Sequence, residues 1–197
     1  MKLVVRVADV SGILRWCQRL LFSGAFVALG YCGFVMLDSW TFQRNELSEF
    51  NRARSVSLPL RASGPPVADA LTGRIEVRRI GLSAMVVEGT TTIALRRAAG
   101  HIAGTGMPGV PGNVGIAAHR DTFFRPLRNI RENDIITLTT VGAEFRYRVV
   151  STKVVEPGDI SVLNPGYDEI LTLVTCYPFY FVGSAPERFV VRAERII

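Results

Sequence analysis

The longest apolar stretch of the chain lies near its start, where residues 20–37 carry no charged side chain. A helix rises about 1.5 Å per residue, so one over this run spans about 27 Å, close to the hydrocarbon thickness of a bilayer. We therefore predict a single transmembrane helix. Arg15 and Arg19 precede the run and Asp38 follows it. By the positive-inside rule, this places the N-terminus in the cytoplasm and the globular part outside.

Two other interpretations of this run are open. A cleaved signal peptide has a similar apolar segment, but no Ala-x-Ala-like site follows residue 37. A buried core helix is the second alternative. We favour an uncleaved anchor, which predicts a single-pass protein of the cell membrane with its globular domain outside the cytoplasm.

The pattern changes twice after the anchor. Residues 41–56 space apolar side chains among Arg, Glu and Asn and are expected to be helical, as a stalk. Residues 57–73 are rich in Pro, Gly and small polar residues, which is typical of a linker. We therefore divide the chain into a cytoplasmic basic N-terminus (1–19), a transmembrane anchor (20–37), a stalk and linker (38–72) and a globular domain (73–197).

Short apolar runs separated by turn residues make up the globular part. Residues 144–149 alternate with period two, so one face of that strand should meet water. The pattern predicts an all-β barrel or sandwich with two short helical pieces, at 93–99 and 123–130. The predicted strands are 74–80, 85–88, 113–119, 135–139, 144–155, 169–175 and 188–195.

The charge of the chain does not point to nucleic acid. It has 23 Lys and Arg against 17 Asp and Glu, a formal net charge of +6. These basic residues are scattered, and no Lys/Arg run is interleaved with aromatic residues, so no nucleic-acid partner is predicted. Four of them, Lys2, Arg6, Arg15 and Arg19, precede the apolar run, which fits a membrane topology.

The positions of the cysteines argue against a disulfide framework and a metal site. Of three cysteines, Cys17 and Cys32 lie in or beside the apolar run, so a disulfide framework is not expected. Cys176 is the only cysteine of the globular domain. The chain has no C-x-x-C pair and no His/Cys cluster, so we predict neither a metal site nor a cofactor.

Three residues at the edges of predicted strands carry the candidate chemistry. Cys176 ends a β-rich run, and Tyr177-Pro178 stops the strand because proline cannot donate to the ladder. His119 ends another apolar run, and Arg188 opens the last predicted strand. A nearby cation favours the thiolate, which is the attacking form of cysteine. Histidine can move protons and a guanidinium can stabilise an oxyanion. Together these residues predict acyl transfer through a thioester.

Each of these residues also has a purely structural interpretation. A lone cysteine is more often a small buried hydrophobe than a nucleophile. His119 can be a structural histidine, and Arg188 a strand-edge charge. His101 precedes the glycine- and proline-rich loop 104–112, and we expect it to make surface or loop hydrogen bonds. Asp121 follows His119 by two residues and either orients it or caps the next turn; we favour the cap.

These motifs resemble those of the sortases, the membrane-anchored cysteine transpeptidases of bacterial surfaces. Residues 171–176, Leu-Thr-Leu-Val-Thr-Cys, are similar to the sortase Thr-Leu-x-Thr-Cys motif, with Arg188 at a family-like distance. Segments similar to those of class D sortases are 113–124, 176–179 and 183–193. The resemblance runs from about Arg74 to Arg195.

Two positions depart from the family pattern. Arg78 stands where a proline is expected, and Ala118 replaces the usual glycine before the histidine. Neither belongs to the candidate triad, although we expect the Ala118 methyl to lie beside the site.

The resemblance implies a closed eight-stranded sortase-type β-barrel with short helices, preceded by the transmembrane helix. It implies a catalytic triad of Cys176, His119 and Arg188 that cleaves a C-terminal Leu-Pro-x-Thr-Gly or Leu-Pro-x-Thr-Ala signal. The partners would be surface proteins with that signal and an amine acceptor, from a cell-wall precursor or a pilin lysine. The substrate-binding positions that it implies are Ala117, Val155, Pro157, Ile160, Val174 and Thr175, with Thr175 next to the oxyanion.

Three rival functions fit parts of the pattern. An L,D-transpeptidase also uses Cys, His and Arg, but its close His-Gly and Ser-x-Gly-x-Cys clustering is not seen. A papain-like hydrolase would carry its cysteine near the start of a helix. The rival from another class is a non-catalytic, membrane-tethered β-domain that binds peptides or wall components, with a structural Cys176.

Overall fold

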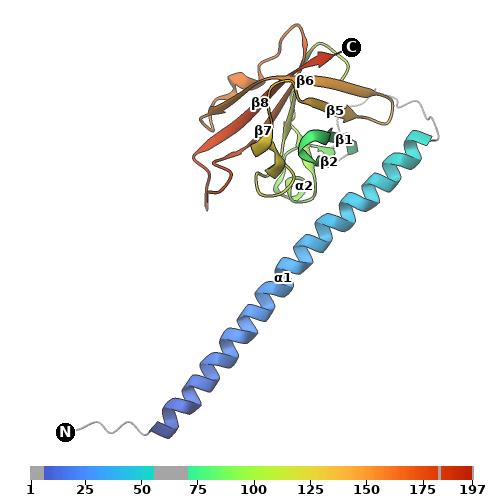
Figure 1. Cartoon of the computed structure of the whole chain (residues 1–197). Coiled ribbons are helices and arrows are strands. Elements are labelled where there is room, and N and C mark those ends of the chain that lie inside the picture. Colours follow the sequence, from blue (N-terminus) through green and yellow to red (C-terminus); the bar gives the residue numbers. More distant parts are fainter. Residues whose placement is uncertain (1–6, 56–70, 182, 197) are drawn as a thin grey trace. The chain divides into compact units, whose positions relative to one another are not determined.

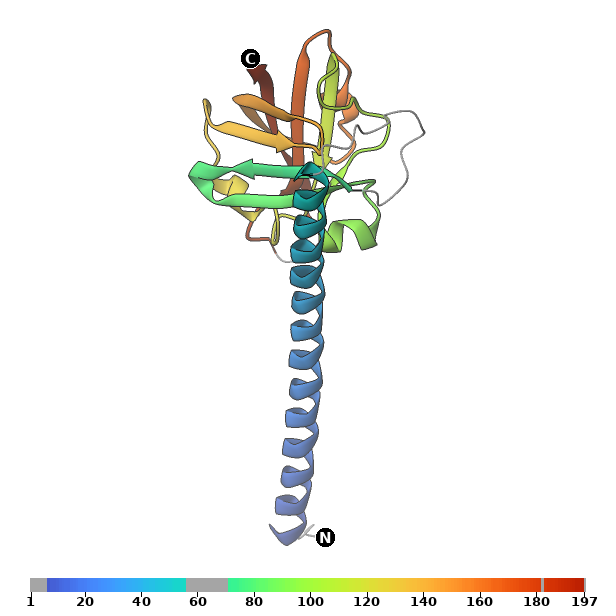
Figure 2. The same cartoon turned by 90° about the vertical axis from the view of Figure 1, so that its right-hand side faces the viewer.

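The computed structural model describes residues 7–55, 71–181 and 183–196, and its first element is one helix of 49 residues, α1 (Val7–Ser55). Figure 2 shows α1 as an uninterrupted helix. The large apolar side chains of residues 20–37 are mostly exposed; Phe26, for example, is 81% exposed. The helix is long and apolar enough to cross a membrane. The predicted apolar helix is confirmed and continues through the expected stalk, whereas the predicted linker lies mostly in residues 56–70, outside the described residues.

Eight strands close into a barrel in the order β1-β2-β3-β4-β7-β8-β6-β5 (Figure 1). The pairs β2–β3 and β4–β7 are parallel, and the other neighbours are antiparallel. Closure pairs every strand on both sides and so removes the free sheet edges. The strands are β1 (Leu71–Val77), β2 (Leu82–Glu88), β3 (Ala99–His101), β4 (Gly112–Ala117), β5 (Ile135–Thr139), β6 (Glu144–Val155), β7 (Glu169–Tyr177) and β8 (Glu187–Ile196).

Four short helices connect the strands: η1 (Arg78–Ile80), α2 (Thr92–Arg97), η2 (Arg125–Asn129) and η3 (Ile160–Leu163). The predicted all-β barrel with short helices is therefore confirmed. The strand predicted over 74–80 ends too late, because its last three residues form η1 before Gly81 turns the chain with φ +67°. The sequence pattern also missed β3, which has only three residues, one of them a glycine, and so shows no alternation.

The barrel interior is filled by alternate residues of each strand. On β7 and β8 the inward set includes Leu171, Leu173 and Val191, all fully buried. Tyr147 on β6 belongs to the same core and is 1% exposed. Its burial, and secondarily the charge of Glu169, raises the pKa of the Tyr147 phenol to about 12.

Residues 42–55 of α1 belong to the same compact unit as the barrel. The Gln43 side-chain amide donates to the Arg97 carbonyl (2.7 Å), and its oxygen accepts from the Met85 backbone N–H (2.9 Å). Phe42 packs against a small apolar cluster of Val87, Ala94 and Ala98. Phe50 is only 2% exposed. The end of the expected stalk is therefore part of the globular unit rather than a free spacer.

Candidate active site

Cys176 and Arg188 lie opposite each other on neighbouring strands. They are paired in the antiparallel register of β7 and β8. Directly paired residues of antiparallel strands place their side chains on the same face of the sheet. Both side chains are partly exposed. The strand β7 ends at Tyr177, where the following proline was predicted to end it.

His119 follows β4, the strand on the other side of β7. In the parallel register of β4 and β7, Ala117 pairs with Val174. The contact continues past the end of β4, since the Ala118 N–H donates to the Val174 carbonyl (3.3 Å). His119 is the next residue, and its side chain is exposed. The three predicted triad residues therefore gather at one end of three neighbouring strands, with the cysteine on the middle one.

Among the described residues, the hydrogen bonds of the triad residues join them to the surrounding backbone and not to one another. The Arg188 guanidinium donates through Nη1 to the Ala185 and Glu187 carbonyls, at 3.2 and 3.0 Å. In the described part of the chain, no hydrogen bond links the Cys176 thiol to His119 or Arg188. Such catalytic hydrogen bonds are often long in a free enzyme and tighten when substrate binds.

Aromatic rings fix the strand ends on the side of the sheet away from the thiol. Phe189 stacks with Tyr177 at 6.2 Å between ring centroids and meets Phe179 edge-on at 5.3 Å. Such ring pairs contribute about 0.5–1.5 kcal/mol each beyond their buried area. They hold the ends of β7 and β8 in register, and so keep Cys176 opposite Arg188.

Arg120, next to His119, ties the β7–β8 connection to the end of β4. Its Nη2 donates to the Phe181 carbonyl (2.7 Å) and to the Gly183 carbonyl (3.0 Å). Its guanidinium also lies 5.9 Å from the centre of the Phe181 ring. Arg120 was not predicted as a functional residue from the sequence. Its contacts are with a loop more than sixty residues away, and no local sequence pattern indicates them.

The outer face of the barrel extends from Cys176 as a floor of side chains. Since Leu171 and Leu173 point inward, the alternate residues of β7 point outward. The strand pairing then sets side chains in rows across this face. The row of Cys176 includes Arg188 and Val155, the second row comprises Ala117, Val174, Val190 and Lys153, and the third comprises Gly115, Thr172, Arg192 and Ser151.

Asn113 holds the β6–β7 connection against this floor. This asparagine is 1% exposed. Its Nδ2 donates to the Val162 and Asn164 carbonyls, at 3.0 and 3.3 Å, and its Oδ1 accepts from the Thr172 hydroxyl (2.7 Å). A side chain at Gly115 would have its Cβ only 3.1 Å from the Leu163 methyl. The glycine therefore lets η3 approach β4 closely.

The six predicted substrate-binding positions fall into three groups. Ala117, Val174 and Val155 lie on the outer face that also bears Cys176. Pro157 and Ile160 are exposed on the β6–β7 connection. Thr175 lies on the inner face: it is 2% exposed and its hydroxyl donates to the Ala118 carbonyl (2.7 Å). Its side chain is thus unavailable to a ligand on the outer face, because the strand alternation turns it into the barrel.

The expectation for Ala118 is corrected by the same alternation. Ala118 is 5% exposed and belongs to the barrel core. Its methyl therefore packs inside, not beside the site. Asp121 is exposed, and within the described residues its carboxylate makes no hydrogen bond to His119 and caps no turn.

His101 is buried, and its expected place at the surface is wrong. It lies in β3, 3% exposed, with Nδ1 2.8 Å from the Glu88 carboxylate. The expected loop hydrogen bond is present, since Nε2 lies 2.9 Å from the Gly106 carbonyl and 3.1 Å from the Thr105 hydroxyl. Both ring nitrogens of His101 therefore have hydrogen-bond partners. His101 thereby anchors the glycine-rich loop and is separate from the triad.

No metal centre is evident near these residues. Over residues 7–55, 71–181 and 183–196, no three His, Cys, Asp or Glu side chains gather in a way that could hold an ion.

Comparison with known proteins gives one family. A model of the sortase domain matches residues 75–196. Sortase D of Bacillus subtilis (strain 168) is 30% identical over 191 residues, which cover 89% of this chain and 96% of that protein. Sortase A of Listeria monocytogenes is 31% identical over 112 residues, 55% of this chain and 50% of that protein.

Solved structures agree with the sequence matches. The structure of a Clostridium perfringens sortase D5 transpeptidase has a TM-score of 0.66 and 26% identity, covering 81% of this chain and 98% of that chain. Sortase A from Corynebacterium diphtheriae has a TM-score of 0.61 and 29% identity, covering 68% of this chain and 63% of that chain. The domain match covers more than half of the chain, and the likeness to Bacillus subtilis sortase D extends over nearly the whole of both proteins. We conclude that the chain belongs to the sortase family of cysteine transpeptidases.

Proposed function

We propose that this sortase cleaves a C-terminal Leu-Pro-x-Thr-Gly or Leu-Pro-x-Thr-Ala sorting signal and transfers the cleaved surface protein to an amine. The observation that carries the proposal is the pairing of Cys176 with Arg188 beside the end of the strand that precedes His119. Each of these residue types has a distinct task in acyl transfer.

Cys176 is the proposed nucleophile. Its thiolate attacks the carbonyl carbon after the signal threonine, and the tetrahedral intermediate collapses to a thioester as the C–N bond breaks. His119 donates the proton that the departing amine needs. In the second step an amine attacks the thioester, His119 removes its proton, and the thiolate leaves.

Arg188 is proposed to stabilise the oxyanion or to hold the bound peptide. A guanidinium keeps its charge and presents donors in a fixed fork. Only Nη1 is engaged with the loop carbonyls of Ala185 and Glu187 in the described structure. The remaining N–H groups are thus free to face a substrate carbonyl on the row of Cys176.

The substrate would lie extended along the outer face of β7. Ala117, Val174 and Val155 supply apolar surface, and the connection bearing Pro157 and Ile160 forms one wall. Recognition of an extended peptide needs such pockets and backbone contacts rather than a deep cofactor cavity. Thr175 would contribute through its backbone alone.

The long apolar helix supports a location in the cell membrane. We propose that residues 20–37 span the bilayer once, with the basic residues 1–19 in the cytoplasm and the barrel outside. The enzyme would then meet surface proteins as they emerge. The acceptor amine would come from a cell-wall precursor or from a pilin lysine, and the reaction would need no cofactor.

A thiol-reactive substrate analogue tests the assignment. A peptide vinyl sulfone carrying the Leu-Pro-x-Thr sequence should label the full-length protein, in detergent micelles, at Cys176. His119→Ala should slow labelling by about a hundredfold, because general acid–base catalysis contributes 10² to 10⁴. Peptide mapping by mass spectrometry measures the site and the rate.

Two exposed cysteines of α1 provide matched controls. Cys17→Ala and Cys32→Ala should label like the wild type, because both residues lie in α1 and not in the barrel. Equal labelling rates in wild type and His119→Ala, or no labelling at Cys176, would instead favour a non-catalytic domain that binds peptides.

A further inference from the structure

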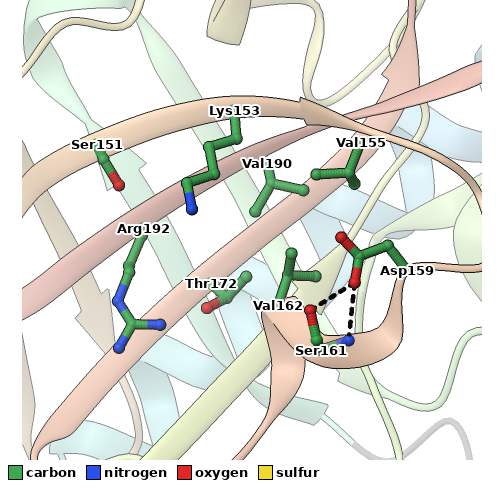
Figure 3. Close-up of a pocket in the computed structure, with 9 residues that line it drawn as sticks. All are labelled: Ser151, Lys153, Val155, Asp159, Ser161, Val162, Thr172, Val190 and Arg192. Carbon is green, nitrogen blue, oxygen red and sulfur yellow. Dashed lines mark hydrogen bonds between the residues drawn. The ribbon is translucent and has the colours of Figure 1, made fainter.

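We propose that the cavity on the outer face of β6, β8 and β7 binds a carboxylate side chain of the sorting signal, on the acyl side of the cleaved bond. The proposal rests on the proposed function, since it adds a recognition point for the same substrate. The cavity holds about 170 Å³, and one of roughly 150 Å³ admits a benzene-sized group. Its lining residues, drawn in Figure 3, are Ser151, Lys153, Val155, Asp159, Ser161, Val162, Thr172, Val190 and Arg192.

Two cationic side chains lie at one end of this cavity. Figure 3 shows Lys153 and Arg192 there, on the same side of the cavity as Ser151. In the described part of the chain, neither Lys153 nor Arg192 has an ion-pair or hydrogen-bond partner. Two cations placed side by side repel each other, and a bound carboxylate relieves that repulsion.

The charged group at the opposite end of the cavity already has hydrogen-bond donors. Asp159 lies there, and its Oδ1 accepts from the Ser161 N–H (3.1 Å) and hydroxyl (2.5 Å), as the dashed lines in Figure 3 show. Between the ends, Val190 is 4% exposed and Thr172 is 1% exposed. The cavity thus has a buried floor and one positive end, which suits the methylenes and carboxylate of a Glu or Asp side chain.

The cavity lies along the same face as the candidate nucleophile. The row of Arg192 lies four residues before Cys176 along β7, and the row of Lys153 lies two residues before it. Strands rise about 3.3 Å per residue, so these rows are about 13 and 7 Å from that of the thiol. An extended peptide covers the longer distance in roughly four residues, and the long cationic side chains extend the reach to about six. Because the third and fourth residues upstream of the cleaved bond are the Pro and Leu of the signal, the carboxylate would lie at the fifth or sixth.

The acyl side follows from the order of the reaction. The cavity lies toward the start of β7, whereas Tyr177 and the β7–β8 connection lie beyond Cys176 at its end. Only the acyl portion stays bound through the thioester stage, and interactions that persist there keep it in place for the acceptor. The leaving peptide has to depart before the acceptor can enter.

Matched peptides test the proposal. Quenched fluorescent peptides with a Leu-Pro-x-Thr core carry Glu or Gln at the fifth or the sixth residue upstream of the cleaved bond, or downstream of it. At one upstream position, the full-length protein should prefer Glu by about tenfold in kcat/KM. The preference should fall as salt rises, because the pair is partly exposed.

Substitutions then assign the preference to the cavity. In Lys153→Met/Arg192→Met the ratio of Glu to Gln turnover should fall to about one, and Arg192→Glu should prefer a Lys-containing peptide. The control Arg78→Met removes one exposed cation from η1, which joins the strands opposite β7 and β8 in the barrel order. It should keep the Glu preference.

Three outcomes would overturn the inference: equal turnover of Glu and Gln peptides at every upstream position, a preference only downstream, or a Glu preference that survives Lys153→Met/Arg192→Met. A carboxylate effect seen only when a carboxylate-bearing amine is the acceptor would assign the cavity to the acceptor and would also overturn the inference.

Absence of any cleavage, even of the Gln peptides, would count against the proposed function instead. Fluorescence anisotropy of the same peptides on Cys176→Ala then measures the Glu preference without turnover.

Discussion

Tyr147 shows how a single side chain couples this barrel to pH. It is buried in the core, and its pKa is raised to about 12, mainly by burial and then by Glu169. A phenol in the unfolded chain ionises near 10. The native state therefore holds its proton more tightly, so the stabilisation is complete below pH 10 and is lost as the pH rises toward 12.

Replacing this phenol tests the coupling. Tyr147→Phe keeps the ring and removes the ionisable hydroxyl, so its free energy of unfolding should change less than that of the wild type between pH 9 and pH 12. The wild type should lose about 1–2 kcal/mol more over this interval. Urea unfolding at fixed pH values measures both. Parallel pH profiles for the two proteins would contradict the assignment.

Glu88 and His101 form a buried hydrogen-bonded pair. Removing either partner would leave a buried polar group without its hydrogen bond, which costs stability. Here the imidazole also reaches Gly106, so the pair fixes the glycine-rich loop beside β4. The loop in turn donates the Gly106 N–H to the Asn113 carbonyl (2.7 Å). A residue outside the triad thereby helps to place the strand that leads to His119.

At the scale of elements, the wall of the proposed substrate groove depends on one asparagine. Asn113 joins β4 to η3 through two carbonyls and to β7 through the Thr172 hydroxyl. Because all three groups lose a buried partner, Asn113→Ala should lower the free energy of unfolding by about 1–3 kcal/mol. It should also raise KM for a sorting-signal peptide several-fold while changing kcat little, because the wall moves and the triad does not.

The exposed Asn129 on η2 provides the control for this prediction. Asn129→Ala leaves in place the backbone carbonyl of residue 129, which accepts a hydrogen bond from Arg79. The variant should therefore retain the wild-type KM and stability. Steady-state kinetics and urea titration measure both variants. Equal KM values for Asn113→Ala and the wild type would show that the wall is held by other contacts.

At the scale of the whole molecule, the globular unit begins before the barrel. Residues 42–55 contribute Gln43, bonded to Met85 and Arg97, and the buried Phe50. Burial of such a phenylalanine stabilises a fold by about 1.5–3 kcal/mol. The last part of α1, residues 42–55, is therefore a packed element of the globular unit.

A pair of truncated chains tests this boundary. A chain of residues 42–197 should unfold at a Tm at least about 5 °C above that of a chain of residues 71–197. The variant Phe50→Ala in the longer chain should lose most of the difference, which separates helix packing from the effect of chain length. Thermal denaturation followed by circular dichroism measures all three. Equal Tm values would show that the helix adds nothing to the barrel.

Sequence reasoning went furthest where a pattern is local. The strands β5 and β6 were predicted with accurate bounds because burial on one side of an element leaves a regular spacing. The apolar helix was predicted over residues 20–37, although α1 extends from Val7 to Ser55. The positions of Cys176, His119 and Arg188 at strand edges could be inferred in the same way, and the resemblance to sortases supplied the closed barrel.

Features that depend on pairing between distant strands could not be predicted from the sequence. His101 is buried rather than at the surface because β3, three residues long, is held between β2 and β4. Thr175 faces inward because register turns alternate residues to opposite faces. The partners of Asn113 lie about fifty to sixty residues away in the sequence, and Lys153 and Arg192 lie about forty residues apart, so no local pattern brings these residues together. Local patterns in the sequence were enough to locate most elements and to name the candidate reactive residues. The fold determined which of them meet, since strand register, unlike hydrophobic spacing, is settled only when the barrel closes.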